Sequence, residues 1–400
     1  MTWVPELVAL ILLISLPFKT AVDKNVRIPL KYGILLFLYL LHILIGFLLN
    51  DITTWTMLAG LRIYFKFIPI FLVPLIYPFT EKAFKNLLLW IYALTMIQLP
   101  VVLWQRFIQF GVTTTGDRMG GTLGVSTSGV LAIFLISIIS FLIAFYYKDE
   151  ISFPVFMVSL AVAFIPITLN ETKISIALLP IAFVFPAFFI RGKREVIFKV
   201  LMTLVLLLMV LIVFKTVYDY FSFKRAGGVG LTAFVTDEQE FKEYNENRLG
   251  PLRNALTIAP KDDLRFALFG RGAGNVSKGF TSILSGKYLR EAYFYDIEMT
   301  FPKLMWEVGI LGTFLFFLFP IFIFFDAVKV SRKEGVPGAY GLGMLTFTVF
   351  FMLSTAYTYT IDSNILIFLY FFAGGQLVHL ANETQEEYEE ARVLGFAQSL

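Results

Sequence analysis

The sequence predicts an all-α, polytopic integral membrane protein, and its composition already indicates this fold class. Of its 400 residues, 58% are hydrophobic and only 16% are charged, and 45 are phenylalanine. An average soluble domain is about 45–50% apolar and about 25% charged. So few charges cannot cover a water-facing surface, which excludes soluble globular, disordered, coiled-coil and collagen-like proteins.

Apolar segments long enough to cross a bilayer recur along the chain. A helix needs about 20 mostly apolar residues to do so. By this criterion we predict about eleven membrane-spanning helices, over residues 3–18, 30–49, 57–78, 84–103, 122–147, 151–169, 173–190, 196–214, 300–325, 337–357 and 362–380. The first segment is short, but it lacks a basic leading region and a small-residue cleavage site. We therefore interpret it as a span rather than a signal peptide.

The basic residues of the short connections alternate between two sides of the predicted bundle. Because short basic loops stay in the cytoplasm, this alternation predicts an N-terminus outside the cytoplasm and a C-terminus inside it. The predicted cytoplasmic connections hold Lys19, Lys24, Arg27, Lys31, Lys82, Lys85, Lys148, Arg191, Lys193, Arg194, Lys199, Lys329, Arg332 and Lys333. The short external connections hold only Arg106, Arg118 and Lys173.

One connection, residues 215–299, is much longer than the others and falls on the external side. Long loops are translocated regardless of their charge, and loops of this length are usually folded or functional. We expect a small, mostly helical cap, with helical stretches at 238–247 and between Pro251 and Pro260. The predicted parts of the chain are residues 1–214 with eight spans, the 215–299 cap, residues 300–381 with three spans, and an acidic cytoplasmic tail at 382–400.

Few residues are available for metal or thiol chemistry. The chain has no cysteine, and its two histidines are His42 and His379. A disulfide framework, a zinc cluster and a thiol nucleophile are therefore excluded, and we predict no metal and no cofactor. The matching half-sequences with interrupted spans that many transporters have are also absent, which disfavours a transporter without excluding it.

Two basic residues, Arg62 and Lys66, lie inside the third predicted span. Charged residues within a span point to function, and the i,i+4 spacing places both on one helix face. If the helix starts near Thr56 on the outer side, Lys66 lies roughly 15 Å down, where an anionic lipid-linked group would fit. A later helix start, which would leave Arg62 at the membrane surface, stays open.

Two short external connections carry further candidates. Arg118 leads a run of small residues whose N–H groups can bind anions and which allow helices to pack closely. The hairpin Asn170-Glu171-Thr172-Lys173 is only four residues long and so stays close to the outer membrane surface. Plain solvated turns are the alternative for both connections.

The long loop contains Arg248, Arg253, Arg265 and Arg271. A guanidinium binds two oxygens in a planar fork, so several converging arginines would suit a diphosphate. Arg271 lies in the glycine run 269–274, which predicts a tight turn and not a dinucleotide motif, because no βαβ unit surrounds it. Solvated arginines, or pairs with Asp262 and Asp263, are the alternative.

Two carboxylates, Asp296 and Glu298, directly precede the ninth predicted span. At the outer membrane surface a carboxylate can accept a proton from an incoming hydroxyl group, so both are candidate general bases. A solvated interface position is the alternative.

In this order and on this side of the membrane, four stretches resemble the O-antigen polymerase and O-antigen ligase superfamily of bacterial cell-envelope glycosyltransferases. The resemblance covers residues 110–320. The four stretches are 118–124, 170–173, Arg248 together with 252–256 and 269–274, and 298–312, which contains a Glu-x-Gly-x-x-Gly pattern at Glu307, Gly309 and Gly312.

The resemblance implies a GT-C-like membrane fold with a periplasmic helical cap, in the bacterial inner membrane. It implies substrates whose oligosaccharide is joined to undecaprenyl diphosphate, with the diphosphate held by Arg118, Lys173 and Arg248. Arg271, Arg62 and Lys66 are further candidates for that role. It also implies glycosyl transfer with Glu298 or Asp296 as the base, and because no metal-ligand cluster is visible in the sequence, we predict that this transfer is independent of metal. A chain-length regulator, a flippase and membrane lipids are the expected partners, and nucleic acid is not.

The chain departs from the family pattern at two positions. It has Lys173 where the family often has arginine, and it has no histidine near the end of the long loop, where the ligases place one. Glu298 occupies that region instead, which favours a polymerase of O-antigen, exopolysaccharide or capsule repeat units. The alternatives are a ligase that transfers a finished glycan to lipid A or protein, and a transporter of lipid-linked oligosaccharides.

Overall fold

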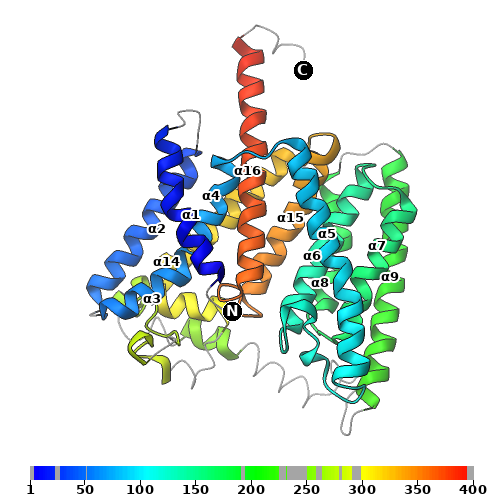
Figure 1. Ribbon diagram of the computed structural model, residues 1–400, viewed down its shortest axis with the longest axis horizontal. Coiled ribbons are helices and arrows are strands. Elements are labelled where there is room, and N and C mark those ends of the chain that lie inside the picture. The colour runs from blue at the N-terminus through cyan, green and yellow to red at the C-terminus, as the bar shows by residue number, and fades with distance from the viewer. Residues whose placement is uncertain are drawn as a thin grey trace. The chain divides into compact units, whose positions relative to one another are not determined.

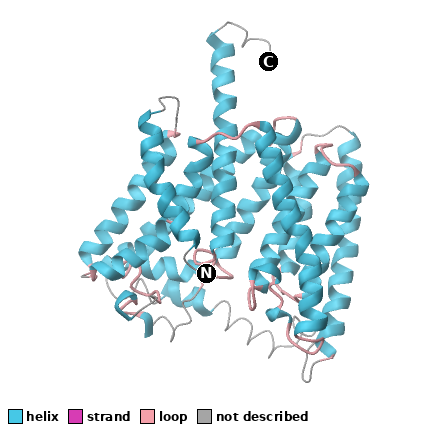
Figure 2. Ribbon diagram, viewed as in Figure 1, coloured by secondary structure: helices cyan, strands magenta, loops and turns pink. Residues whose placement is uncertain are grey.

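The computed structural model describes residues 4–22, 28–50, 52–190, 194–224, 231, 250–257, 264–278, 282–290 and 299–393. These residues are helical or lie in turns and loops, and none of them forms a strand (Figure 2). The chain divides into two compact units. Unit 1 comprises Met1–Pro78, Glu243–Phe325 and Phe351–Leu400, and unit 2 comprises Phe79–Lys242 and Asp326–Phe350. Each unit contains residues from more than one of the four predicted parts of the chain. The boundaries of those four parts stay a prediction.

Aromatic packing between α4 and α16 forms much of the core of unit 1. Phe67 stacks on Phe371 with the ring centroids 4.0 Å apart. Gly375 lets the two helices approach closely, because an added Cβ there would lie 2.1 Å from the carbonyl oxygen of Phe71. The helices of the unit are α1 (Val4–Val22), α2 (Leu30–Leu49), α3 (Thr54–Phe65), α4 (Phe67–Ile76), α12 (Leu264–Phe269), most of α14 (Thr300–Val330) and α16 (Asn364–Val393) (Figure 1).

In unit 2, the helix α6 is largely buried and packs against α7, α8 and α9. Most residues of α6 are buried, as expected for a helix that is apolar all round. The helices of the unit are α5 (Glu81–Trp104), which continues as a π-helical turn at Gln105–Gln109, α6 (Ser128–Tyr147), α7 (Phe153–Leu169), α8 (Ser175–Val184), extended by a 3-10 turn at Phe185–Phe189, α9 (Arg194–Phe223) and most of α15 (Gly335–Thr355).

Seven helices in the described part of the chain are long and apolar enough to cross a membrane, or eight if α3 and α4 together form one bent span. The chain is thus a polytopic helical protein, as the composition predicts. Three shorter apolar helices, Leu7–Leu16, Phe153–Leu169 and Ser175–Phe189, fall on three further predicted segments.

The third predicted span is not one continuous helix, because it bends by 42° between α3 and α4. The physical reason is Pro69, which lacks an N–H and whose ring clashes with the carbonyl group four residues earlier, that of Phe65. Lys66 therefore lies at a helix break and not partway down a straight helix.

Two helix boundaries also differ from the expected ones. α6 begins at Ser128 and not at residue 122, because Gly121 and Gly124 have positive φ angles of 60° and 108° and interrupt the helix. α9 continues past residue 214 to Phe223. Tyr218 and Phe221 continue a buried apolar stripe from Phe214 onto this extension. The helical spacing of these three residues is hard to recognise in the sequence because charged residues lie between them.

The expected cap is described only in part. Residues 250–257 are helical, within the stretch that Pro251 and Pro260 were expected to bracket. The helical stretch predicted at 238–247 lies outside the described residues.

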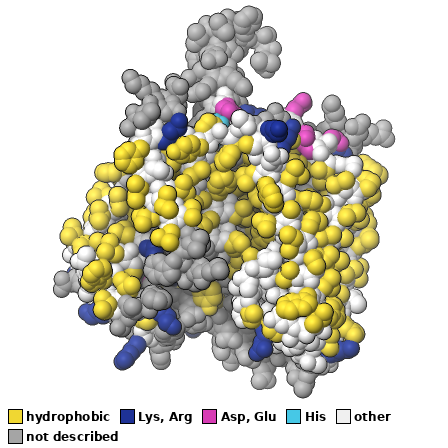
Figure 3. All heavy atoms as spheres, in the orientation of Figure 1, with side chains coloured by type: hydrophobic (Ala, Val, Ile, Leu, Met, Phe, Trp, Pro, Cys, Tyr) yellow, Lys and Arg dark blue, Asp and Glu magenta, His cyan; other side chains and the backbone are white. Residues whose placement is uncertain are grey.

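The flanks of the helices carry large apolar side chains, and charged side chains gather towards the helix ends (Figure 3). Leu30 and Leu48 in unit 1 are both 77% exposed, and Trp90 in unit 2 is 71% exposed. Water disfavours so much exposed apolar surface, whereas lipid does not.

Candidate functional site

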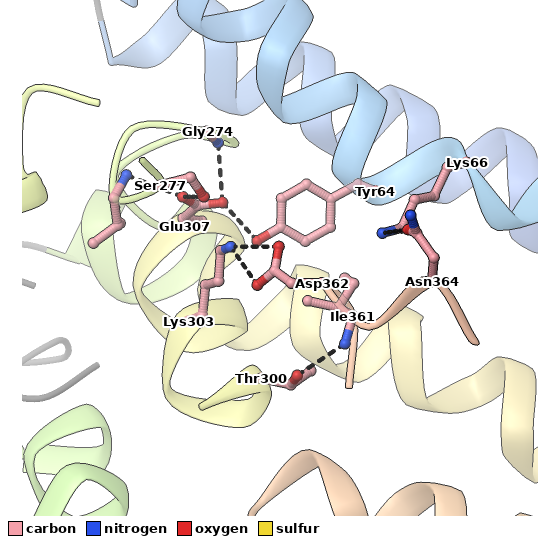
Figure 4. Close-up of polar contacts among 11 residues, drawn as sticks. Tyr64, Lys66, Gly274, Ser277, Thr300, Lys303, Glu307, Ile361, Asp362 and Asn364 are labelled. Atoms are coloured by element: carbon pink, nitrogen blue, oxygen red, sulfur yellow. Dashed lines mark hydrogen bonds and ion pairs between the residues drawn. The ribbon is translucent and has the colours of Figure 1, made fainter. Parts of the chain in front are cut away.

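A buried carboxylate near the start of α14 organises one end of unit 1. Glu307 has no exposed surface. Its Oε1 accepts hydrogen bonds from the N–H of Val276 at 3.0 Å and from Ser277 Oγ at 2.7 Å. Its Oε2 accepts from the N–H of Gly274 at 3.0 Å and from the Tyr64 hydroxyl at 2.7 Å. A carboxylate has about four acceptor sites, so Glu307 is saturated, and it fastens α3 and the turn after α12 to α14 (Figure 4).

Glycines bring that turn into backbone contact with its neighbours. Gly270, Gly272 and Gly274 have φ angles of +69°, +95° and +87°, which confirms the predicted tight turn. An added Cβ on Gly270 would lie 2.5 Å from the backbone of Glu307, and one on Gly274 would lie 2.4 Å from the carbonyl oxygen of Thr56. Side chains at these positions would therefore push the turn away from α14 and α3.

The backbone of α14 is interrupted at Gly309, whose φ of 67° and ψ of −172° are accessible almost only to glycine. Gly309 faces the turn, since an added Cβ would lie 2.5 Å from the backbone nitrogen of Gly270. Next to the interruption, the carbonyl of Val308 contacts His42 Nε2 at 2.7 Å. A carbonyl only accepts, so Nε2 carries the hydrogen. Glu307 and Gly309 thus have structural roles in the Glu-x-Gly-x-x-Gly pattern.

An ion pair lies next to this buried carboxylate. Lys303 Nζ lies 3.1 Å and 2.8 Å from the two carboxylate oxygens of Asp362, in the segment before α16. The Lys303 side chain is only 10% exposed, whereas that of Asp362 is 38% exposed. Lys303 also lies within electrostatic range of Glu307 and Arg62. Because Lys303 occupies the first turn of α14, where the helix dipole disfavours a cation, the carboxylates of Asp362 and Glu307 stabilise its charge there, whereas Arg62 opposes it.

Lys66, at the break between α3 and α4, provides a second buried cation at the same end of unit 1. Its Nζ donates a hydrogen bond of 2.7 Å to Asn364 Oδ1, only two residues beyond Asp362. Figure 4 shows the two pairs, Lys66 with Asn364 and Lys303 with Asp362, on opposite sides of Tyr64. Arg62 is exposed, one turn earlier on α3. Arg62 lies within electrostatic range of Lys303, and Lys66 bonds to Asn364 in the segment that also carries Asp362, so the predicted pair lies at the same end of unit 1 as Lys303.

Arg271 is held in a different way. Its guanidinium lies 4.0 Å from the ring centroid of Trp306, 5.0 Å from that of Tyr288 and 5.9 Å from that of Phe266. Its backbone N–H also donates to the carbonyl of Trp306 at 2.7 Å. These contacts place the Arg271 guanidinium against aromatic rings at the start of α14. Diphosphate binding by Arg271 stays a prediction.

In unit 2, a buried ion pair fixes the short connections that carry Arg118 and Lys173. Arg106, in the π-helical turn, has no exposed surface and donates to Glu171 Oε1 at 2.7 Å and to the carbonyl of Thr114 at 2.9 Å. Its guanidinium also lies 3.8 Å from the ring centroid of Phe221. The 170–173 hairpin is therefore anchored and is not a plain solvated turn.

Two glutamines, Gln98 of α5 and Gln105 of the π-helical turn that continues it, hold the glycine run after Arg118. Gln105 accepts from the N–H of Gly121 at 2.9 Å and donates to its carbonyl at 3.0 Å. Gln98 likewise accepts from the N–H of Thr122 at 3.0 Å and donates to its hydroxyl at 2.7 Å. These bonds set the path of the loop that presents Arg118, whose side chain is exposed.

The predicted site residues divide between the units. Arg62, Lys66 and Arg271 belong to unit 1, and Arg118 and Lys173, which is partly buried, belong to unit 2. Arg248, Asp296 and Glu298 lie outside the described residues. Within the described ranges, no group of three or more His, Asp or Glu side chains is placed to hold a metal ion.

The sequence patterns do not predict the contacts that Lys303, Glu307, Tyr64 and Asp362 make with one another. One signal was available, because Lys303 and Glu307 are charged residues with i,i+4 spacing inside the ninth predicted span. A second was the polar stretch 355–364 between the last two spans, where hydroxyl, carboxylate and amide side chains are frequent. Tyr64 and Asp362 gain their significance only from contacts with residues far away in the chain.

No protein-family model matches the chain, and no curated protein matches it at a significant level.

Proposed function

We propose that this protein is a polysaccharide polymerase that joins undecaprenyl-diphosphate-linked oligosaccharide repeat units by glycosyl transfer on the periplasmic face of the bacterial inner membrane. The observation that carries the proposal is a set of three cations, Arg62, Lys66 and Lys303, at the same end of unit 1 as the partly exposed carboxylate of Asp362, which pairs with Lys303. Glycosyl transfer from a lipid diphosphate needs positive charge for the leaving group and a carboxylate for the attacking hydroxyl.

Burial makes these cations suited to an anionic group. Lys66 is 7% exposed and Lys303 is 8% exposed, and each has a polar partner, as buried lysine almost always does. A charge with little access to water interacts more strongly with an anion than a solvated charge does. Buried lysines at the end of an apolar helix bundle therefore favour a diphosphate on a lipid over a soluble anion.

The proposal includes eleven spans in a GT-C-like arrangement, with the N-terminus and the long loop periplasmic and the C-terminus cytoplasmic. The seven candidate spans, the bent α3–α4 pair and the three shorter apolar helices together support that count. The short basic connections support that orientation. Arg118, Lys173, Arg248 and Arg271 remain predicted ligands of the diphosphate.

The proposed reaction needs no metal or cofactor. The hydroxyl of one lipid-linked repeat attacks the anomeric carbon of the growing chain, and the bond from that carbon to the diphosphate oxygen breaks. Basic residues stabilise the negative charge that develops on the departing undecaprenyl diphosphate. Asp296 and Glu298 remain predicted bases for the attacking hydroxyl, and a chain-length regulator and a flippase remain predicted partners.

The direct test supplies the purified full-length protein, in lipid nanodiscs, with lipid-linked single repeats from the source cell. A polymerase produces a ladder of chain lengths. Transfer only to lipid A or to protein would instead indicate a ligase. Movement of the lipid-linked repeat across a liposome membrane without a new glycosidic bond would indicate a transporter.

Substitutions test the predicted ligands separately from the activity. Arg248→Ala is expected to abolish chain growth while the protein still inserts and purifies. If Arg118→Ala, Arg248→Ala and Glu298→Gln all produced wild-type ladders, the predicted site would be wrong even for a working polymerase.

A further inference from the structure

We infer that Asp362 is the proton acceptor of the reaction and that Lys303 exchanges partners during it, pairing with Asp362 before the donor binds and with the donor diphosphate afterwards. The inference rests on the proposed function, because it assigns residues within that same site. It adds a catalytic carboxylate and a diphosphate ligand to the residues that the sequence patterns single out.

The contrast between the two carboxylates near Lys303 indicates which of them is available for chemistry. Glu307 is fully buried, and its oxygens already accept four hydrogen bonds, so no acceptor site remains for a substrate hydroxyl. Among the residues that the structure describes, only Lys303 Nζ donates to the Asp362 carboxylate, and the Asp362 side chain is 38% exposed. Of these two groups, Asp362 alone has acceptor capacity that a substrate can reach.

Lys303 can change partners because the carboxylate it pairs with is partly exposed. It donates no side-chain hydrogen bond to Glu307, and water can reach the Asp362 carboxylate and solvate it once the ammonium group turns away. A diphosphate carries more negative charge than one carboxylate and therefore competes well for the ammonium group. Arg62 and Lys66, at the same end of the unit, favour the arrival of that anion.

The segment beside Asp362 suits a saccharide acceptor. The Tyr359 side chain is 48% exposed, and its carbonyl accepts the backbone N–H bonds of Asp362 at 3.1 Å and Ser363 at 2.8 Å. A tyrosine combines an apolar ring face, on which a sugar ring can stack, with a polar tip. The acceptor sugar would thus lie against Tyr359 with its hydroxyl directed to the Asp362 carboxylate.

The donor diphosphate takes Lys303 from Asp362, and the freed carboxylate accepts the proton of the acceptor hydroxyl. The acceptor oxygen forms its bond to the anomeric carbon while the bond from that carbon to the diphosphate breaks, with the electron pair leaving on the diphosphate. When undecaprenyl diphosphate departs, Asp362 loses the proton to solvent and pairs with Lys303 again.

Binding of inorganic pyrophosphate to the purified full-length protein tests the exchange without any turnover. Asp362→Asn removes the competitor for Lys303, so we expect binding about two- to fivefold tighter than in the wild type, the size of a partly exposed ion pair. Lys303→Met removes the ligand, so we expect binding roughly ten- to a hundredfold weaker. A purely structural ion pair predicts the same weakening in both variants, and that result, or no change in either, would overturn the exchange.

Turnover with lipid-linked repeats tests the base. Asp362→Asn should lower kcat roughly 10²- to 10⁴-fold despite its tighter anion binding. Wild-type kcat in this variant would refute the base while leaving the polymerase intact. If the wild type itself forms no ladder, the base assignment falls together with the proposed function, and the pyrophosphate measurement alone decides the exchange.

Two controls keep the result interpretable. Lys215 and Asp219 form an i,i+4 ion pair of 2.7 Å on α9, and Lys215→Met and Asp219→Asn should leave pyrophosphate binding and turnover unchanged. If Asp362→Asn does not purify as a monodisperse protein, Asp362→Glu replaces it. This variant keeps the charge but displaces the carboxylate, so turnover should fall at least tenfold with near wild-type binding, and unchanged turnover would refute the base.

Discussion

Replacing Glu307 with glutamine tests how the start of α14 is fastened to α3 and to the turn after α12. Glutamine keeps the size of the side chain, but it has one acceptor oxygen in place of two and gains two N–H donors. In either orientation its amide nitrogen meets a backbone N–H, that of Gly274 or that of Val276, which cannot turn away. The neighbouring hydroxyl, of Tyr64 or Ser277, can reverse and accept instead.

The expected cost follows from these four hydrogen bonds. One buried N–H is left without an acceptor, which costs about 1–3 kcal/mol. The three remaining bonds lose the charge of their partner, and each loses about 1–1.5 kcal/mol, since bonds to charged groups contribute about 1.5–3 kcal/mol and neutral bonds about 0.5–1.5 kcal/mol. The free energy of unfolding should therefore fall by roughly 4–7.5 kcal/mol.

Thermal unfolding of the purified Glu307→Gln protein in detergent measures this loss, and hydrogen exchange locates it. The amides of Gly274 and Val276 should be protected in the wild type and exchange faster in the variant. Glu150→Gln, at an exposed residue before α7, is the matched control and should change stability by less than about 0.5 kcal/mol. The reasoning is refuted if Glu307→Gln unfolds at the same temperature as the control and both amides stay protected.

Three further substitutions test other contacts, each by thermal unfolding. Gly309→Ala should destabilise the protein more than Gly111→Ala does, because both residues have positive φ but only Gly309 has backbone atoms within 2.5 Å of an added Cβ, and equal losses would contradict this. Tyr64→Phe should cost about 1–3 kcal/mol by removing one of the four donors to Glu307, and its effect should largely vanish in a Glu307→Gln background. Arg106→Met should cost about 3–5 kcal/mol by leaving the Glu171 carboxylate buried without its main cation, and Arg106→Met combined with Glu171→Met should recover much of that loss; an additive double variant would argue against coupling.

Composition and hydropathy predicted the helical class, and each segment expected to span is largely helical in the structure. These features depend on the local sequence, because about 20 apolar residues form a helix in lipid whatever follows them. The break at Lys66 was also readable, since Pro69 disrupts the helix one turn earlier. The apolar run 57–78 predicts one continuous helix only if the effect of Pro69 is neglected.

The contacts of the candidate site were less predictable. The pattern Glu307-x-Gly309 is part of the family resemblance, but the contacts of Glu307 depend on Tyr64, 243 positions earlier in the chain. Likewise, Asp362 reads as an ordinary polar residue between two spans until Lys303 is placed beside it. Sequence spacing predicts which residues share a helix face, but it does not predict which distant segments meet that face.

The order in which the two units are completed during synthesis follows from how the chain is divided between them. Most of unit 2 is one continuous stretch, Phe79–Lys242, whereas unit 1 joins the beginning, the middle and the end of the chain. The first four helices are made early, yet α4 packs against α16, which leaves the ribosome after all the described helices of unit 2. Domains usually form in order from the N-terminus. Here we expect the reverse, so that the ribosome must reach α16 before the first helices made acquire their final neighbours.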